Sequence, residues 1–555
     1  MLKLLNSNRQ LIKQWQVDNN PRSIEFTTHS TELISHVEDT KSITIFYGFL
    51  DQECNQNSPA QFISGILSRQ GVTGLNDCYG SFIVIHYNKN EHKYTIANDA
   101  LGDFAVHYMT ANQTLSISDL PQALINHDNT INHQRVLHYF ALSKPQNNGS
   151  FFKNIKQLNP GHCLIVTPND QNVNRYYFPK QTINPKIKCT KIISEQFKSI
   201  MQTAITFQSQ GQKNVGIMMS GGMDSTFVAA NCKKADKQVK AFSYVFPNMP
   251  SANESIWLDT MRKQGYDMHT FAGESHWPLK SPWYVSLNSP INNPYRHLKS
   301  VIYQQAQNQQ LKILLSGTFA DHLYIGYIYW LVDQVKNKPF TAVKSIYKTL
   351  IKHGLMTGLR QISPAKFSSK IKYSAKWLSK SAANELSDIT KKYSKFSHPH
   401  PQQYDLVYGI STAQSNWLDN EHAFKHNIFV RHPFRDRRVV EFLMDFPAWV
   451  LGNIDNRKQF VRNAAQDILP KSIINRTQIT TLEPLFLKGI LEKEFDKVQQ
   501  ILSDSSCQWQ NFINKKTVND IIDNPSHKHK DSHLVILWQC LNYEMWRHSI
   551  ANVSP

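Results

Sequence analysis

A strand that runs into Ser-Gly-Gly-Met-Asp-Ser constrains this chain more than any other feature of its sequence. The apolar strand is expected over Val215 to Met219, and a turn and a helix follow it. Gly221 and Gly222 allow backbone N–H groups to close around an anion, and the helix N-terminus adds its positive dipole end. The segment therefore predicts a loop that binds the pyrophosphate of ATP, and the alternative is an ordinary glycine turn.

This loop differs from the other common phosphate-binding loop. It lacks the Gly-x-x-x-x-Gly-Lys-Ser/Thr pattern of the P-loop. Ser220 and Ser225 offer hydroxyl groups, and Asp224 can hold Mg²⁺. The predicted chemistry is the cleavage of ATP to AMP and pyrophosphate, with the adenylate transferred to a substrate.

A second strand ends in the same way. Leu314 and Leu315 lead into Ser316 and Gly317, and Asp321 follows four residues after the glycine. Asp224 and Asp321 would give two carboxylates for the Mg²⁺ ions that bridge ATP phosphates. The alternative for Asp321 is a favourable contact with the dipole at a helix N-terminus.

The order of the elements predicts an α/β protein with two domains. Residues 1–180 carry short β-prone runs bounded by Gly, Asn and Asp, whereas residues 190–555 alternate helices with short apolar strands. The alternation is typical of a parallel sheet covered by helices, in which ligands bind at the carboxyl ends of the strands. Ser220 and Ser316 would both lie at that edge.

Charge is concentrated in one segment of this strongly basic chain. Of the formal net charge of +19, residues 331–400 contribute 14 Lys and Arg against three acidic residues. We expect a basic helical insertion over 331–410, and its surface could face an acidic peptide or protein, a nucleic acid or only solvent. The segment lacks the regular aromatic residues of a single-strand platform, which does not favour nucleic acid.

Composition also bears on the compartment. No apolar run approaches the roughly 18 residues that a membrane helix needs, and the N-terminus does not resemble a signal peptide. Seven scattered cysteines without a Cys-x-x-Cys pair argue against a disulfide framework. We expect a cytoplasmic protein with no membrane segment.

Five motifs in this order resemble the synthetase domain of the asparagine synthetase superfamily. They are Ser-Gly-Gly-x-Asp-Ser, Leu-Ser-Gly-x-x-x-Asp, Val430-Arg-His-Pro-Phe-Arg-Asp-Arg-Arg, Arg457-Lys-Gln-Phe-Val-Arg462 and Leu469-Pro470. Residues 98–108 and 151–162 look like segments of the same family's front domain. The resemblance implies a class II glutamine amidotransferase-like αββα front domain of the Ntn-hydrolase type, followed by an adenine-nucleotide α-hydrolase-like domain.

One departure indicates which kind of member this is. A glutamine-hydrolysing member carries a nucleophilic cysteine directly after the initiator methionine, and this chain has Leu2 there. The first cysteine is Cys54, so glutamine cannot be opened by this route. The front domain is similar to the amidotransferase fold without its catalytic group, as in β-lactam synthetases and lasso-peptide cyclases.

The synthetase motifs depart from the family as well. Thr318 stands where asparagine synthetases have a glutamate, and Gln478 stands where the family has a charge-neutralising lysine. Four basic residues could supply the positive charge of the missing family lysine: Lys458, Arg462, Arg476 and Lys488. Glu254 resembles an acidic residue of the family, with a helix-capping role as the alternative.

The resemblance implies an ATP-dependent enzyme that forms an amide or macrolactam, most like a lasso-peptide cyclase. ATP would bind at Ser220, Gly221, Gly222, Ser225, Ser316 and Gly317, with Mg²⁺ on Asp224 and Asp321. The substrate would be a peptide with an acidic side chain, delivered by a protease partner that removes a leader. The alternatives are an ammonia-dependent amidotransferase acting on a small acid, a tRNA-modifying pyrophosphate-loop enzyme and a binding subunit without turnover.

Overall fold

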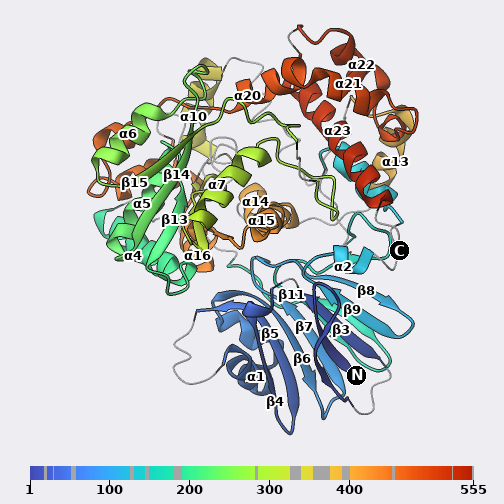
Figure 1. The fold of residues 1–555 in the computed structure, drawn as a ribbon. Coiled ribbons are helices and arrows are strands. Elements are labelled where there is room, and N and C mark those ends of the chain that lie inside the picture. The colour runs from blue at the N-terminus through green and yellow to red at the C-terminus, as the bar shows by residue number, and fades with distance from the viewer. Residues whose placement is uncertain are drawn as a thin grey trace.

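Figure 1 shows the fold of the full chain in a computed structural model. The structure describes residues 1–552 with the exception of 18–21, 29, 52–57, 126–129, 144–148, 181–189, 282–284, 325–334, 336–338, 354–375, 391–400, 453–456 and 528. The predicted insertion at 331–410 therefore lies partly outside the described residues. Its described parts are helical, namely α10 (Pro339–His353), α13 (Lys380–Thr390) and α14 (Pro401–Tyr408).

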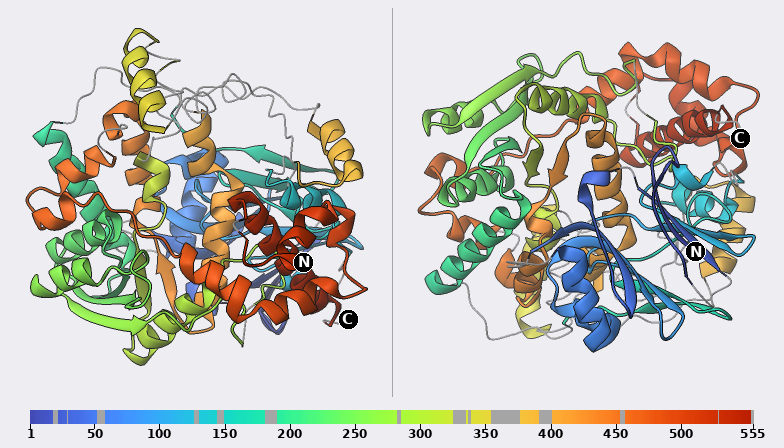
Figure 2. Two further views of the ribbon diagram at one scale, coloured as in Figure 1. Left: turned by 90° about the horizontal axis from the view of Figure 1, so that it is seen from above. Right: turned by 60° about the horizontal axis from the view of Figure 1, so that its bottom comes forward.

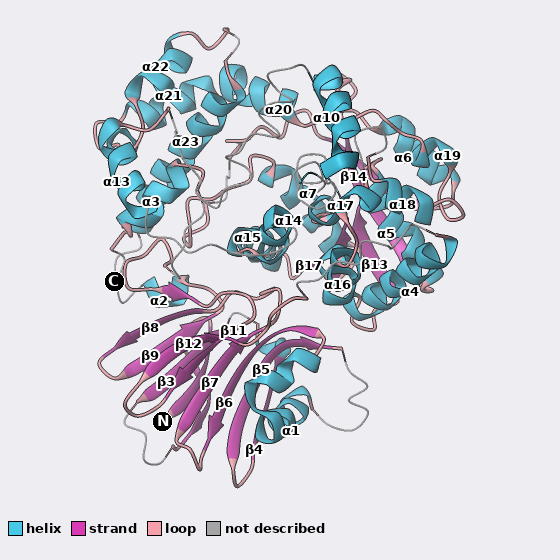
Figure 3. Ribbon diagram, turned by 180° about the vertical axis from the view of Figure 1, so that it is seen from behind, coloured by secondary structure: helices cyan, strands magenta, loops and turns pink. Residues whose placement is uncertain are grey.

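Two six-stranded sheets form the front domain (Figures 1 and 3). The first has the order β10 (Lys156–Gln157), β8 (His107–Ala111), β9 (Thr114–Ser118), β3 (Ser23–Thr28), β1 (Leu2–Asn6) and β2 (Leu11–Trp15). The second has the order β12 (Gln171–Arg175), β11 (His162–Val166), β7 (Lys93–Asn98), β6 (Gly80–Asn88), β5 (Ser42–Leu50) and β4 (Ile34–Glu38).

Alternation along the strands explains how these sheets pack. On β6, Ile83 and Ile85 point into the core between the sheets, while Phe82 and Val84 point to the opposite face. Helix α1 (Pro59–Gln70) covers that outer face, and Ser58 caps its first turn. The mixed α/β front domain and its two-sheet core agree with the predicted fold class.

A five-stranded parallel sheet organises the second domain. Its order is β15 (Asp267–Ala272), β14 (Gln238–Val245), β13 (Asn214–Met218), β16 (Ile313–Ser316) and β17 (Phe429–Arg431). Helices α4 (Lys191–Gln208), α5 (Met223–Lys234), α6 (Ser255–Lys263) and α16 (Arg437–Met444) share one core with the sheet. Helices α7 (Arg296–Asn308) and α15 (Ile410–Phe424) pack on the other face.

The strand order creates a site for ligands. The chain winds outward from β13 to β14 and β15, and then returns to place β16 on the other side of β13. Loops at the carboxyl ends of two such neighbours diverge and leave a crevice at this switch point. The Ser-Gly motifs after β13 and β16 therefore lie at one edge, which confirms the predicted arrangement of the parallel sheet.

The C-terminal helices form a further layer that contacts both domains. Helices α21 (Phe495–Ser503), α22 (Lys515–Asp523) and α23 (Asp531–Ala551) enclose an aromatic core. Phe140, at the end of α3 (His133–Phe140), contacts Phe512 and Tyr543 in that core. Figure 1 shows these helices, in red, above the short helix α2 (Gln122–Ile125) of the front domain.

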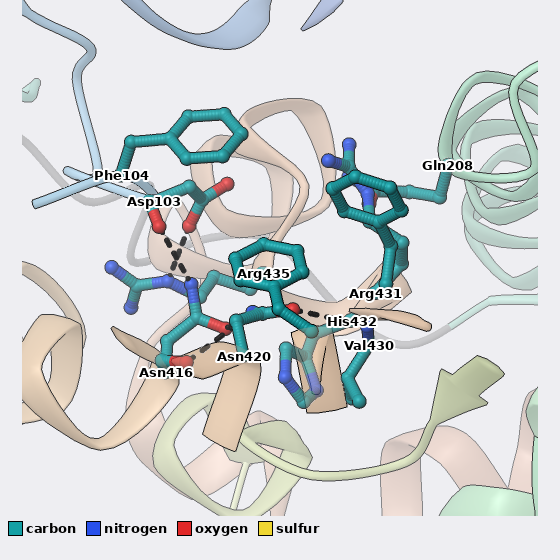
Figure 4. A pocket seen from close by; sticks show the side chains of 11 residues that line it. Asp103, Phe104, Gln208, Asn416, Asn420, Val430, Arg431, His432 and Arg435 are labelled. Atoms are coloured by element: carbon teal, nitrogen blue, oxygen red, sulfur yellow. Dashed lines mark hydrogen bonds and ion pairs between the residues drawn. The ribbon is translucent and has the colours of Figure 1, made fainter. Parts of the chain in front are cut away.

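Arginines of the Arg-His-Pro-Phe-Arg-Asp-Arg-Arg motif join the two domains. Arg435 is 4% exposed, and its Nε donates to Asp103 Oδ1 at 2.7 Å. Arg438 pairs with Asp51, and the Arg437 guanidinium lies over Tyr79. Figure 4 shows the part of this joint around Arg435 and Asp103, where a cavity of about 20 Å³ has room for roughly one water molecule.

Replacement of Arg435 by Ala tests whether this joint holds the domains together. Removing one partner of a buried ion pair leaves the other charge unpaired, so R435A should lower the free energy of unfolding by about 3–5 kcal/mol. As the control, R262A breaks the pair between Arg262 and Asp259, in which Arg262 is 46% exposed, and should cost at most about 1 kcal/mol. Urea denaturation checks both, and equal losses would contradict the role of Arg435.

Candidate functional site at the carboxyl edge of the parallel sheet

Internal hydrogen bonds shape the loop between β13 and α5. The backbone N–H of Ser220 donates to Ser225 Oγ at 3.0 Å, and the Ser225 hydroxyl donates to the Ser220 carbonyl at 3.0 Å. Gly222 N–H donates to Ser220 Oγ at 3.2 Å, and Gly222 is the N-cap of α5. The two predicted serines therefore hold the loop closed around the start of the helix, where backbone N–H groups favour an anion.

The glycine after β16 lies directly against this loop. A Cβ atom on Gly317 would come within 2.6 Å of the Ser225 backbone nitrogen and 2.8 Å of the Asp224 carbonyl carbon. Only glycine fits such a close approach of two backbones. The two predicted motifs are thus in contact, and Ser316 next to Gly317 hydrogen-bonds Thr318 Oγ1 at 2.7 Å.

A lysine joins the two predicted metal-binding carboxylates. Lys458 Nζ lies 2.5 Å from Asp224 Oδ2 and 2.8 Å from Asp321 Oδ1. Tyr324, on α8 (Ala320–Tyr324), donates its hydroxyl to Asp224 Oδ1 at 2.8 Å. Lys458 precedes α18 (Gln459–Ala464) and has a left-handed backbone, with φ of 57°. Three segments that are far apart in sequence therefore meet at one cation.

Burial and charge act in opposite directions within this group. Burial raises the pKa of Asp224, and Lys458 only partly offsets that effect. Burial alone would lower the pKa of Lys458, but Asp224 and Asp321 outweigh it and raise that pKa. Lys458 is therefore a protonated cation at neutral pH, held between two carboxylates in a partly desolvated site.

Arg476 lies against Gly221 of the loop. Its Nη2 atom lies 2.7 Å from Glu254 Oε1, and its guanidinium carbon lies 3.7 Å from the Trp257 ring centroid. Glu254 precedes α6, but its side chain makes no capping bond to that helix. The helix-capping alternative for Glu254 is therefore wrong, because the carboxylate accepts instead from Gly221 N–H at 3.1 Å.

The other predicted catalytic residues lie in different surroundings. Thr318 is exposed beside the loop, next to Gly317. The Arg462 guanidinium donates to the backbone carbonyls of Arg457, Ile474 and Arg476, so it supports the segment that carries Arg476. Gln478 and Lys488 are exposed, and neither has a hydrogen bond from its side chain to the loop among the described residues.

The front domain offers no activated thiol among its described residues. Leu2 is fully buried in the core between the two sheets. Cys78 and Cys163 are buried, and burial raises the pKa of the Cys163 thiol to about 11. A thiol with a raised pKa is a poor nucleophile at neutral pH, because the thiolate is the reactive form.

The described residues include no group of three or more His, Cys, Asp or Glu side chains arranged to hold a metal ion. Among the described helices, none is long and apolar enough to cross a membrane.

Ala at position 317 tests the contact between the two motifs. Because a Cβ there would meet backbone atoms of Ser225 and Asp224, G317A should displace the loop and weaken ATP binding by at least tenfold, about 1.4 kcal/mol. The control is G65A on α1, where a Cβ would meet only the Arg69 side chain at 3.8 Å. Calorimetric titration with ATP measures both, and unchanged binding by G317A would contradict the assignment of this loop.

Comparison with known proteins places this site in a family. Residues 196–548 match the asparagine synthase family, and residues 46–177 match the glutamine amidotransferase domain. Asparagine synthetase (glutamine-hydrolyzing) 1 of Bacillus subtilis is 22% identical over 85% of this chain and 77% of its own length. Amidase chry2 of Gibberella zeae is 19% identical over 85% of this chain and 79% of its own length. The chain belongs to the asparagine synthase family, and it is an ATP-dependent carbon–nitrogen ligase that forms AMP and pyrophosphate.

Proposed function

We propose that this ligase closes an amide bond within a peptide, as a macrolactam synthetase of the lasso-peptide cyclase kind. The observation that carries this proposal is the absence of an activated thiol among the described residues of the front domain, where Leu2, Cys78 and Cys163 are buried; Cys54 lies outside those residues. Without a cysteine nucleophile to release ammonia from glutamine there, the nitrogen would come from free ammonia or from an amine of a substrate. The N-terminal amine of the substrate itself is the simplest source.

The first step would activate a carboxylate of the peptide. An oxygen of an Asp or Glu side chain attacks the α-phosphorus of ATP, the bond to the bridging oxygen of the β-phosphate breaks, and pyrophosphate leaves. The loop N–H groups and the α5 N-terminus would bind the phosphates through Ser220, Gly221, Gly222 and Ser225, with Ser316 and Gly317 supporting the loop. Lys458 and Arg476 would supply positive charge to the same phosphates.

Asp224 and Asp321 fit a site for Mg²⁺ bound together with ATP. Both carboxylates already converge on one cation, Lys458 Nζ, at 2.5 and 2.8 Å. One or two carboxylates with phosphate oxygens and water are the usual ligands of this ion in ATP sites. Mg²⁺ would neutralise phosphate charge there. Asp224 and Asp321 would orient it, and Lys458 would exchange a carboxylate for a phosphate oxygen.

The second step would form the new bond. The peptide amine attacks the acyl carbon of the adenylate, the bond from that carbon to the AMP oxygen breaks, and the amine nitrogen loses a proton. Holding amine and acyl carbon in one site replaces a bimolecular reaction by an intramolecular one. A protease that frees the N-terminal amine of the peptide would be the partner that supplies this substrate.

Helix α10 supports a peptide as the substrate. It exposes Phe340, which is 94% accessible, together with Val343, Tyr347 and Ile351. Spacings of three and four residues place these side chains on one face of the helix, with Lys344 exposed beside them. Figure 2 shows α10, in yellow, standing out from the body of the synthetase domain. An apolar face with adjacent positive charge suits a peptide that carries apolar and acidic side chains.

Release of AMP and pyrophosphate tests the proposal directly. The enzyme with Mg²⁺ and ATP is offered either a leaderless peptide with a free amine and an internal Asp or Glu, or aspartate with ammonium. We expect AMP only with the peptide, together with the loss of one water from the peptide mass. AMP only with aspartate and ammonium would replace the proposal by an ammonia-dependent amidotransferase.

The variant F340S/K344E tests α10. Loss of an apolar contact and reversal of one charge should raise the KM for the peptide by about tenfold or more and leave the KM for ATP unchanged. The control is I192S/K263E, which changes an exposed isoleucine on α4 and an exposed lysine on α6. Equal peptide KM values in both variants would show that α10 does not contact the substrate.

A further inference from the structure

Glu254 connects the pyrophosphate loop to Arg476 through its two carboxylate oxygens. Its Oε2 atom accepts from Gly221 N–H at 3.1 Å. Its Oε1 atom accepts from Arg476 Nη2 at 2.7 Å and from the Thr480 hydroxyl at 2.5 Å. Thr480 Oγ1 also lies 2.9 Å from Arg476 Nη2. Each oxygen therefore has its own donors, and one side chain links the two segments.

The Arg476 guanidinium is fixed in a defined orientation. It stacks over Trp257, and its Nε donates to the Gln478 carbonyl at 3.1 Å. A Cβ atom on Gly221 would come within 2.5 Å of Trp257 Cβ and 3.0 Å of Arg476 Nη1. The guanidinium plane is thus held directly against the loop, with Nη1 as its nearest nitrogen.

Nη1 is the one nitrogen of this guanidinium without a hydrogen-bond acceptor among the described residues, and it is buried. A buried charged donor without an acceptor is costly, so this position calls for an oxygen. A phosphate on the loop provides one, because a guanidinium can bond a carboxylate through one nitrogen and a phosphate through another. Gln478, which is exposed and uncharged, cannot supply that charge.

We propose that Glu254 is a positioning residue that holds Arg476 on the loop, so that Nη1 of Arg476 binds the pyrophosphate part of ATP. The charge that Gln478 does not provide then comes from Arg476, which lies against Gly221 of the loop. This inference rests on the binding of ATP by the loop and not on the identity of the acyl substrate.

A neutral amide at position 254 would break this arrangement for a geometric reason. Both oxygens of Glu254 face donors, so the NH₂ group of a glutamine would face either Gly221 N–H or the pair Arg476 and Thr480. One donor must then move away. E254Q should therefore displace Arg476 from the loop although its size is unchanged.

Binding of inorganic pyrophosphate with Mg²⁺ to the full chain, measured by calorimetry, tests the inference without any acyl substrate. R476Q should weaken binding by about 10–100-fold, since it removes a charged hydrogen bond. E254Q should weaken it by a similar factor, and E254Q/R476Q should be no weaker than R476Q alone, because Glu254 acts through Arg476. The control D259N, on helix α6 that follows Glu254, should bind as the wild type does.

The variant R476K tests the role of the guanidinium group separately from its charge. R476K keeps the charge but has a single nitrogen, so it should bind pyrophosphate as weakly as E254Q does; this variant remains informative if E254Q does not fold. Wild-type affinity for pyrophosphate in E254Q or R476K would overturn the inference. So would an E254Q/R476Q variant whose loss of affinity equals the losses of the two single variants combined. Failure of the peptide assay would leave these binding results unchanged, so the two proposals fail separately.

Discussion

The ion group of Lys458, Asp224 and Asp321 is the interaction on which the site depends. Asp224 comes after β13, Asp321 after β16 and Lys458 before α18, so one ammonium group brings together three separate segments. The close approach of Gly317 to the Asp224 and Ser225 backbone places the two carboxylates near each other. The lysine then stabilises two like charges that would otherwise repel each other in a partly buried site.

The front domain contributes through contacts with the synthetase domain. Three arginines that follow the last strand of the parallel sheet contact acidic and aromatic side chains of the two-sheet domain, namely Arg435, Arg437 and Arg438. Leu2 contributes to the core of that domain. In our account the amidotransferase-like fold serves this ligase as a structural partner of the synthetase domain, and the substrate supplies the nitrogen.

The sequence allowed prediction of the parts of the site that lie within local motifs. Strand, glycine turn and helix follow one another around Ser220 and Ser316, and parallel pairing brings both turns to one edge. The role of Glu254 was not predictable in the same way, because its partners come from two other segments, one with Gly221 and one with Arg476 and Thr480. The position of Glu254 before a helix made helix capping a possible role, and only the tertiary contacts of its side chain exclude that role. Tyr324 was missed for the same reason.

The measurement that tests the central claim most directly follows the oxygen atoms of the substrate. A peptide with ¹⁸O in the side-chain carboxylate is incubated with the enzyme, Mg²⁺ and ATP, and the phosphate products are analysed by mass spectrometry. If the carboxylate attacks the α-phosphorus, one ¹⁸O atom appears in AMP for each ring formed, and pyrophosphate carries none. Label in inorganic phosphate with ADP as the nucleotide product, or rings formed without labelled AMP, would contradict the account.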